Sequence, residues 1–159
     1  MLHLADTNLL LRLAEPKHPM HAEARGAINA LVAKGDTVCT IPQNIIEFWN
    51  VATRPAVNNG LGFTTAQTQA EVEKIEKLFQ VIPDVAEIFA EWKRLVIAHA
   101  VIGKQVHDTR LVAAMNVHQI THLLTFNKDD FKRFQGITVL SPQEVMAPPP
   151  QSPTPNPAN

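Results

Sequence analysis

Four carboxylates stand where a soluble protein rarely places an unpaired charge, beside predicted strand ends or inside apolar helix faces. They are Asp6, Glu47, Asp108 and Asp130. Burying a carboxylate is unfavourable unless it is paired with a base or bound to a cation. Because no basic side chains are matched with these four, we interpret them as ligands of a divalent metal ion, which indicates chemistry on phosphates.

Each of these carboxylates also has a simpler interpretation. Asp6 and Asp108 could be helix N-caps, and Asp130 could lie on a solvated surface helix. Glu47 has apolar neighbours on both sides: Ile45, Ile46, Phe48 and Trp49. At helical spacing these neighbours would bury much of the turn, although the Glu47 side chain could still face outward between them.

Strand-like and helix-like segments alternate along the chain. Short apolar runs predict strands at Met1–Ala5, Thr37–Ile41, Phe79–Pro83, Thr121–Thr125 and Ile137–Leu140. Helical periodicity and capping residues predict helices at Asn8–Leu13, His18–Ala33, Asn44–Thr53, Thr64–Leu78, Val85–Ala100, Asp108–Val117 and Lys128–Phe134. Strands separated by helices predict an α/β fold, in which a parallel sheet carries helices on both faces.

This arrangement predicts that the acidic residues converge. In parallel sheets, ligands bind beyond the carboxyl ends of the strands. Asp6 directly follows the first predicted strand, and both Asn127 and Asp130 follow the fourth. Glu47 lies near the start of the helix after the second strand, and Asp108 begins the helix that leads into the fourth. All are compatible with one site, whose oxygen ligands would suit Mg²⁺ or Mn²⁺.

Length and composition indicate one globular domain followed by a different tail. The chain has 159 residues, of which 45% are hydrophobic and 18% charged, as in ordinary soluble domains. Residues 147–159 contain six of the twelve prolines and no charged or large apolar side chain. We therefore predict a globular domain at 1–146 and a disordered, proline-rich tail at 147–159.

Charge, cysteine and histidine disfavour other classes of protein. The net charge of −1 provides no global basic field, so nucleic acid would have to bind at a local patch or through the metal. The single Cys39 is predicted to be a buried, inert thiol. The seven histidines lack the paired spacing of a zinc site. No signal peptide or membrane-length apolar run is visible, which predicts a cytoplasmic protein.

With its motifs in this order, the chain resembles the PIN-domain ribonucleases and, within them, the VapC-type toxins. Asp6 with the six residues after it resembles the first motif of the family, and Glu47, which an aromatic residue follows, resembles the second. Asp108 at the head of its helix resembles the third, and the segment Leu124-Thr125-Phe126-Asn127-Lys128-Asp129-Asp130-Phe131 resembles the fourth. The resemblance extends from Leu2 to about Val145.

The resemblance implies a fold, an activity and partners. The fold is a three-layer αβα sandwich around a twisted, mainly parallel sheet. The activity is endonucleolytic cleavage of RNA by a metal-activated water, which leaves a 5′-phosphate and a 3′-hydroxyl. Asp6, Glu47 and Asp108 would hold one or two Mg²⁺ ions. Members of this family are usually homodimers, and a small antitoxin protein inserts into their active-site groove.

Further residues near the motifs have two candidate roles each. Thr7 and Thr125 could orient a ligand or the water by hydrogen bonds, or they could act as local caps. Arg12 and Arg110 could contact RNA phosphates, or they could remain solvated surface charges.

One position departs from the family pattern. Asn127 stands where members often have an aspartate, and its neutral amide would hold a second metal less tightly. Asp130 is the predicted source of the missing charge, ahead of Asp129, because Phe131 follows it as in the family.

Two rival functions belong to other classes. A non-catalytic PIN-like RNA-binding or scaffold protein is the main alternative, although that class typically loses one or more carboxylates. A haloacid-dehalogenase-type phosphatase is disfavoured, because Asn8 stands where such an enzyme needs its second aspartate.

Overall fold

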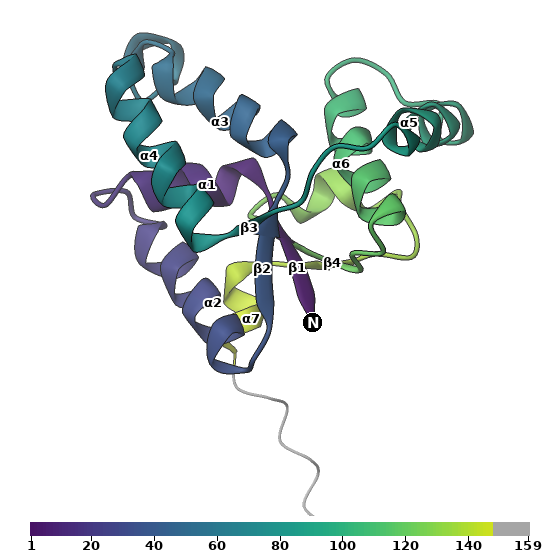
Figure 1. Ribbon diagram of the computed structural model, residues 1–159, viewed down its shortest axis with the longest axis horizontal. Coiled ribbons are helices and arrows are strands. Elements are labelled where there is room, and N and C mark those ends of the chain that lie inside the picture. Colours follow the sequence, from purple (N-terminus) through teal and green to yellow (C-terminus); the bar gives the residue numbers. More distant parts are fainter. Residues whose placement is uncertain (148–159) are drawn as a thin grey trace, which may run out of the picture.

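A five-stranded sheet forms the centre of the computed structural model, which describes residues 1–147. The strand order is β3-β2-β1-β4-β5, and every neighbouring pair is parallel (Figure 1). The strands are β1 Leu2–Ala5, β2 Thr37–Thr40, β3 Gln80–Val81, β4 His122–Leu124 and β5 Thr138–Leu140. The predicted parallel sheet is confirmed, and each strand is shorter than predicted.

Helices cover both faces of the sheet and complete a three-layer αβα sandwich (Figure 1). One layer contains α5 Glu87–Ala98 and α6 Gln105–Val117. The other contains α1 Thr7–Ala14, α2 His21–Ala33, α3 Pro42–Thr53, α4 Thr65–Leu78 and α7 Pro142–Met146. Two short 3₁₀ helices, η1 Ala56–Asn58 and η2 Lys128–Phe131, lie in connections.

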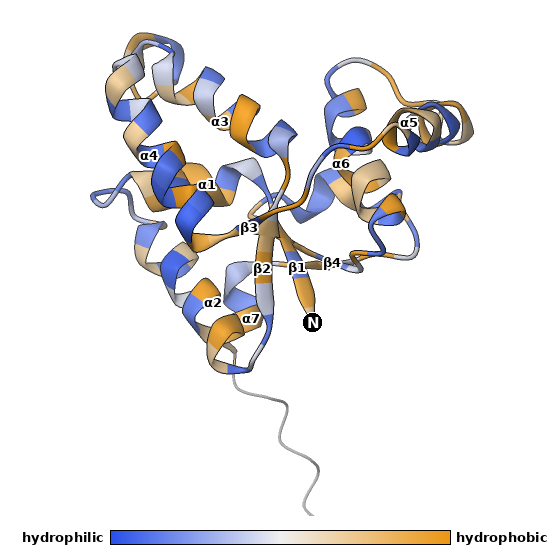
Figure 2. Cartoon of the chain, viewed as in Figure 1, coloured by the Kyte–Doolittle hydropathy of each residue, from blue (hydrophilic) through white to orange (hydrophobic). Residues whose placement is uncertain are grey.

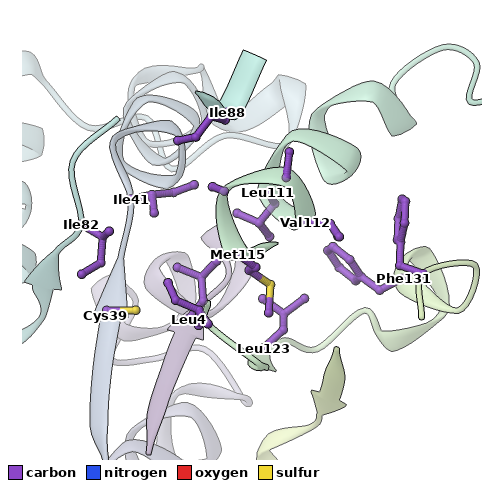
Figure 3. Packing of buried hydrophobic residues seen from close by; sticks show 14 of the residues in the cluster. Leu4, Cys39, Ile41, Ile82, Ile88, Leu111, Val112, Met115, Leu123 and Phe131 are labelled. Atoms are coloured by element: carbon purple, nitrogen blue, oxygen red, sulfur yellow. The ribbon is translucent and has the colours of Figure 1, made fainter. Parts of the chain in front are cut away.

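The alternation of side chains along the strands divides the core in two. Leu4, Cys39 and Leu123 pack with α5 and α6 on one face (Figure 3). Their strand neighbours, such as Ala5 and Leu124, pack with α1, α2 and α3 on the other. Because both faces are covered, the central strands are largely apolar, as the orange segments of β1 and β2 in Figure 2 show. Cys39 is buried as predicted, and burial raises the pKa of its thiol to about 12.

Two local predictions were wrong, and one helix was missed. The predicted helix over 128–134 is the 3₁₀ helix η2, in which the Asp130 N–H donates to the Asn127 carbonyl at 3.2 Å. Helix α6 begins three residues before Asp108, with Lys104 at its N-cap position. Helix α7 was not predicted, although Ser141 and Glu144 form the reciprocal hydrogen bonds of a capping box, a pattern that is visible in the sequence.

The proline-rich tail lies, apart from Ala147, outside the described residues, so its predicted disorder stays a prediction. Among residues 1–147, no helix combines the length and the apolar character needed to cross a membrane.

Candidate functional site

Asp6 lies at the carboxyl end of β1 and serves two purposes at once. Its Oδ1 accepts the Thr7 N–H at 2.7 Å and so caps α1. Its Oδ2 accepts the Thr125 hydroxyl at 2.6 Å and the Asn8 amide at 2.8 Å. The interpretation of Asp6 as a helix cap is therefore correct, but it explains only the role of Oδ1. The side chains of Thr125 and Asn8 orient Oδ2.

Thr125 joins the ends of β1 and β4. Besides donating to Asp6, its hydroxyl accepts the Asn8 amide at 2.9 Å and the Asn127 N–H at 3.0 Å. The side-chain oxygen of Asn8 accepts the Phe126 N–H at 3.2 Å. The segment that carries Asn127 is thus attached to the segment that carries Asp6.

Glu47 lies on α3, half-buried, and each of its two carboxylate oxygens accepts a hydrogen bond. The Thr7 hydroxyl donates to Oε2 at 2.9 Å, and the Gln43 amide donates to Oε1 at 2.8 Å. The buried Asn44 amide donates in turn to the Thr7 hydroxyl at 3.1 Å.

The apolar residues that flank Glu47 differ from expectation. Ile46 is 67% exposed and Trp49 37% exposed, so the expectation that both help to bury the turn is wrong. Because α3 packs on the sheet through Phe48 and Ala52, Ile46 and Trp49 belong to its outward side.

Asp108 lies in the first turn of α6, but it is not the N-cap, so the capping interpretation of this residue is wrong. Among the described residues, salt bridges include none of Asp6, Glu47, Asp108 and Asp130. Asp6, Glu47 and Asp108, which are partly buried, therefore lack the basic partner that would offset the unfavourable burial of charge, whereas Asp130 is exposed.

The electrostatics of the site show that the carboxylates act on one another. The pKa of Asp6 is raised to about 6, mainly by burial and with a smaller contribution from the charges of Glu47 and Asp108, against hydrogen bonds from Thr125 and Thr7. Burial also raises the pKa of Asp108 to about 6, helped by the charges of Asp130 and Glu47 and only partly offset by nearby cations. The carboxyl end of the sheet is thus a region of uncompensated negative potential.

The described residues contain no group of three His, Cys, Asp or Glu side chains close enough together to hold one ion in the observed rotamers. The types of donor nevertheless fit a hard divalent cation, since the converging groups are carboxylates and one amide without basic partners. The side chains would have to draw together around an ion.

Candidates for a fourth ligand lie around η2. Asn127 and Asp130 are both exposed there. The negative charge of Asp130 contributes to raising the pKa of Asp108. Asp129 instead pairs with Lys132 at 2.6 Å.

The two arginines near the motifs both have acidic partners within the protein. Arg12 pairs with Glu15 at 2.5 Å on α1. Arg110 pairs with Asp84 at 3.0 Å and donates to the Gln43 side-chain oxygen at 3.0 Å.

A cleft of about 530 Å³ opens above Glu47, between the two helical layers. Its lining is Gln43, Ile46, Glu47, Asn50, Asp84, His107 and Arg110. The sequence-based prediction missed Gln43, Asn44, Asn8 and Asp84. A signal existed for Gln43, since a polar residue four positions before Glu47 shares its helix face.

Comparison with known families agrees with this geometry. Residues 4–137 match the PIN domain family. The chain belongs to the PIN-domain family. No curated protein matches this PIN-domain chain.

Solved structures share the PIN-domain fold at low identity. VapBC2 of Rickettsia felis, bound to a DNA fragment from its promoter, is 16% identical with a TM-score of 0.69, covering 89% of this chain and 98% of that one. A toxin–antitoxin complex from Klebsiella pneumoniae is 22% identical with a TM-score of 0.62 and the same coverages, 89% and 98%. VapC20 of Mycobacterium tuberculosis, a toxin that cleaves the sarcin–ricin loop, is 16% identical with a TM-score of 0.60 and coverages of 80% and 92%.

Proposed function

We propose that this PIN-domain protein is a Mg²⁺-dependent endoribonuclease, the toxin of a toxin–antitoxin pair. The observation that carries the proposal is the set of carboxylates at the carboxyl end of the sheet, which form no salt bridge among the described residues. Burial and the neighbouring carboxylate charges raise the pKa of two of them, Asp6 and Asp108. A divalent cation would neutralise such a set, and it would also activate a water and stabilise charge on a scissile phosphate.

In this proposal Asp6, Glu47 and Asp108 hold the cation, with Mn²⁺ as a possible substitute for Mg²⁺. When bound, the ion would supply a water of lowered pKa and positive charge at the scissile phosphate. Thr125 and Asn8 orient one oxygen of Asp6. Thr7 orients Glu47, so both predicted threonines have a positioning role here.

The fourth ligand belongs to the segment after β4. We propose Asp130, whose charge acts on Asp108, as the ligand that supplies the charge lacking at Asn127. Asn127 can still contribute an amide oxygen, because Thr125 holds its backbone beside Asp6.

The structural neighbours support a proposal about partners. VapC20 is a toxin that cleaves the sarcin–ricin loop, and the Klebsiella structure is that of a toxin–antitoxin complex. By analogy we propose an RNA substrate, a small antitoxin protein, a homodimer and a cytoplasmic location.

The test compares the wild-type protein with Asp6→Asn on RNA, with Mg²⁺, with Mn²⁺ and with a chelator. Asparagine caps a helix about as well as aspartate, so the variant can keep the cap of α1. It loses the charge and the second acceptor oxygen, which takes the hydrogen bonds of Thr125 and Asn8. We expect cleavage by the wild type that stops with chelator and is lost in the variant. Equal cleavage under all conditions, or none by folded wild-type protein over a range of metal concentrations, would refute the proposal. RNA binding without cleavage would favour the non-catalytic PIN-like alternative.

A further inference from the structure

Gln43 is a buried polar side chain whose amide is fully used. It lies one helical turn before Glu47 and is 9% exposed. Its nitrogen donates to Glu47 Oε1 at 2.8 Å and to the His107 carbonyl at 2.9 Å, and its oxygen accepts from Arg110 at 3.0 Å. Because arginine only donates and a carbonyl only accepts, these partners determine which way the amide points.

These bonds cross from one helical layer to the other. Gln43 and Glu47 lie on α3, whereas His107 directly precedes Asp108 on α6. The bond to the His107 carbonyl therefore ties the turn that carries Glu47 to the turn that carries Asp108. Arg110 extends the connection to Asp84, in the segment between β3 and α5, at 3.0 Å.

We propose that Gln43, held in place by Arg110 and Asp84, is the positioning residue that sets the separation of Glu47 and Asp108 and so the affinity of the site for its cation. This inference rests on the proposed function. It also assigns Arg110 to the protein's own architecture rather than to an RNA phosphate.

The chemistry of glutamine suits this role. Its amide donates to a carboxylate without adding positive charge, so the negative potential that attracts a cation is kept. A lysine at this position would compete with the ion, and a glutamate would repel Glu47. The positive charge of Arg110 is balanced by Asp84, on the other side of the amide from Glu47.

The experiment replaces the amide by a side chain of similar length that cannot form hydrogen bonds. We expect Gln43→Met to weaken Mn²⁺ binding, measured by calorimetry or electron paramagnetic resonance, by about 10–100-fold, as for other groups that orient metal ligands. RNA cleavage should recover at saturating Mn²⁺ with an unchanged KM for RNA.

A matched control is available on α6. Gln105 also accepts a hydrogen bond from an arginine, Arg133, at 2.6 Å. Gln105→Met should leave Mn²⁺ affinity unchanged, because its amide orients no carboxylate of the site. The melting temperature without metal is recorded for both variants, so that loss of folding is separated from loss of positioning.

Arg110→Met tests the assignment of that side chain. We expect weaker Mn²⁺ binding and an unchanged dependence of the KM for RNA on salt. A residue that contacts a phosphate would instead reduce the slope of log KM against log salt by about 0.7 for single-stranded RNA. A reduced slope with unchanged metal affinity would overturn the assignment.

The outcomes separate the two proposals. Wild-type protein that binds no Mn²⁺ would refute the proposed function, and this inference with it. Wild-type protein that binds Mn²⁺ no better than Gln43→Met would refute the positioning role alone. If Gln43→Met does not fold, Asp84→Asn decides instead, since its side chain is 42% exposed and its loss loosens only Arg110. We expect it to bind Mn²⁺ more weakly than the wild type, and equal affinity would overturn the inference.

Discussion

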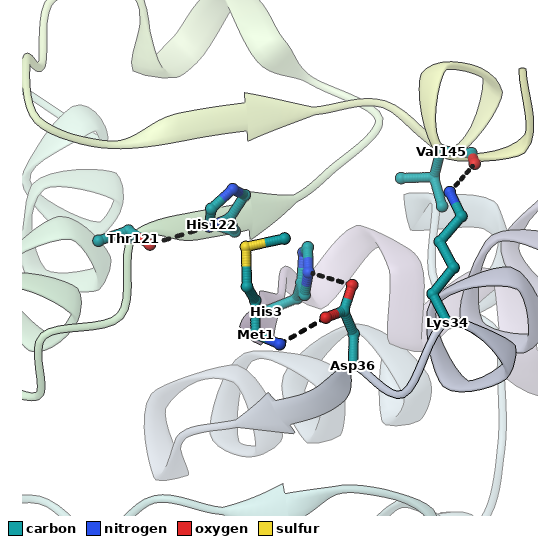
Figure 4. A network of polar contacts seen from close by, with 7 residues as sticks. All are labelled: Met1, His3, Lys34, Asp36, Thr121, His122 and Val145. Atoms are coloured by element: carbon teal, nitrogen blue, oxygen red, sulfur yellow. Dashed lines mark hydrogen bonds and ion pairs between the residues drawn. The ribbon is translucent and has the colours of Figure 1, made fainter. Parts of the chain in front are cut away.

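Acidic side chains lie at both ends of the central sheet, but their partners and the direction of their pKa shifts differ between the two ends. At the amino end, Asp36 accepts hydrogen bonds from the Met1 amino group and from His3, which is 1% exposed (Figure 4). The pKa of Asp36 is held below its ordinary value, mainly by the hydrogen bond from the amino group and to a smaller extent by His3. At the carboxyl end, Asp6 and Asp108 lack such partners, and burial raises the pKa of each to about 6.

This difference distinguishes a structural charge from a functional one. An acid that is paired with bases stabilises the fold and has little attraction left for a ligand. An acid that is buried beside other acids destabilises the metal-free fold and attracts a cation strongly. We therefore expect the amino end to serve stability and the carboxyl end to serve binding.

The largest expected effect is a loss of RNA cleavage when a carboxylate at the carboxyl end of the sheet is replaced. Asp108→Asn should lower the rate of RNA cleavage by at least about 100-fold, because it removes a proposed metal ligand. The melting temperature without metal should stay the same or rise, since a charge whose pKa is raised is unfavourable in the folded state. Steady-state cleavage assays and thermal unfolding test both. A variant that kept more than a tenth of the activity would contradict the assignment of Asp108.

Added Mg²⁺ should stabilise the folded protein only by binding at the carboxyl end of the sheet. At a Mg²⁺ concentration of about 100 times the dissociation constant, binding stabilises the folded state by about 2.7 kcal/mol, which corresponds to a rise in melting temperature of about 5–10 °C. Asp36→Asn should show the same rise, and Asp108→Asn little or none. Differential scanning calorimetry measures it, and an equal rise in Asp108→Asn would mean that the ion binds elsewhere.

As the pH rises, the contribution to stability of groups at the carboxyl end of the sheet should fall and that of His3 at the amino end should rise. The pKa of Asp6 and of Asp108 is raised from 3.8 to about 6, so their contribution to stability is present below about pH 4 and is lost as the pH rises through about 6. Burial lowers the pKa of His3 from 6.5, so its contribution is present above that pH and is lost on acidification.

We therefore expect Asp6→Asn to become more stable relative to wild type as the pH rises from about 4 to 7. Urea unfolding without metal measures this difference. Saturating Mg²⁺ should reverse it, because only the wild type keeps every proposed ligand of the ion. A difference that is independent of pH would show that Asp6 has an ordinary pKa.

Weakening the contacts of Asp36 at the amino end of the sheet should lower stability and leave RNA cleavage unchanged. Asp36→Asn removes the negative charge and one of the two acceptor oxygens that the Met1 amino group and His3 use. The Nδ1 of His3 already lacks a partner among the described residues. We expect a melting temperature lower by about 2–4 °C and RNA cleavage within about twofold of wild type. Loss of cleavage by a folded Asp36→Asn protein would end the distinction between the two sheet ends.

The smallest expected effect concerns the fourth ligand. Asn127→Asp adds a carboxylate near Asp6 and Thr125, and we expect Mn²⁺ binding to tighten several-fold, while Asp130→Asn should weaken it by a similar factor. Asp129→Asn is the control, because Asp129 pairs with Lys132, the residue that follows the 3₁₀ helix η2. An unchanged affinity in Asp130→Asn would leave Asn127 as the better candidate.

Sequence patterns predicted the layers and the positions of the acids, but not how the acids are held. Asp6 was found because it ends an apolar run, and Asp108 because it lies in the first turn of an amphipathic helix. The exposure of Ile46 and Trp49 was not predicted, because both faces of α3 carry apolar residues and periodicity alone does not show which one packs on the sheet. The helix predicted at 128–134 is a 3₁₀ helix over Lys128–Phe131, and the connection around it buries Phe131 and Phe134 in the core.

The sequence by itself determined the parallel sheet and the strand ends at which Asp6, Asn127 and Asp130 stand, because local periodicity and chain order are properties of neighbouring residues. Only the tertiary structure decided which atoms meet. Thr125 donates to Asp6 across 119 residues, and Arg110 donates to Gln43 across 67. Such contacts depend on how two helical layers are placed on one sheet, and that placement results from the packing of the whole core.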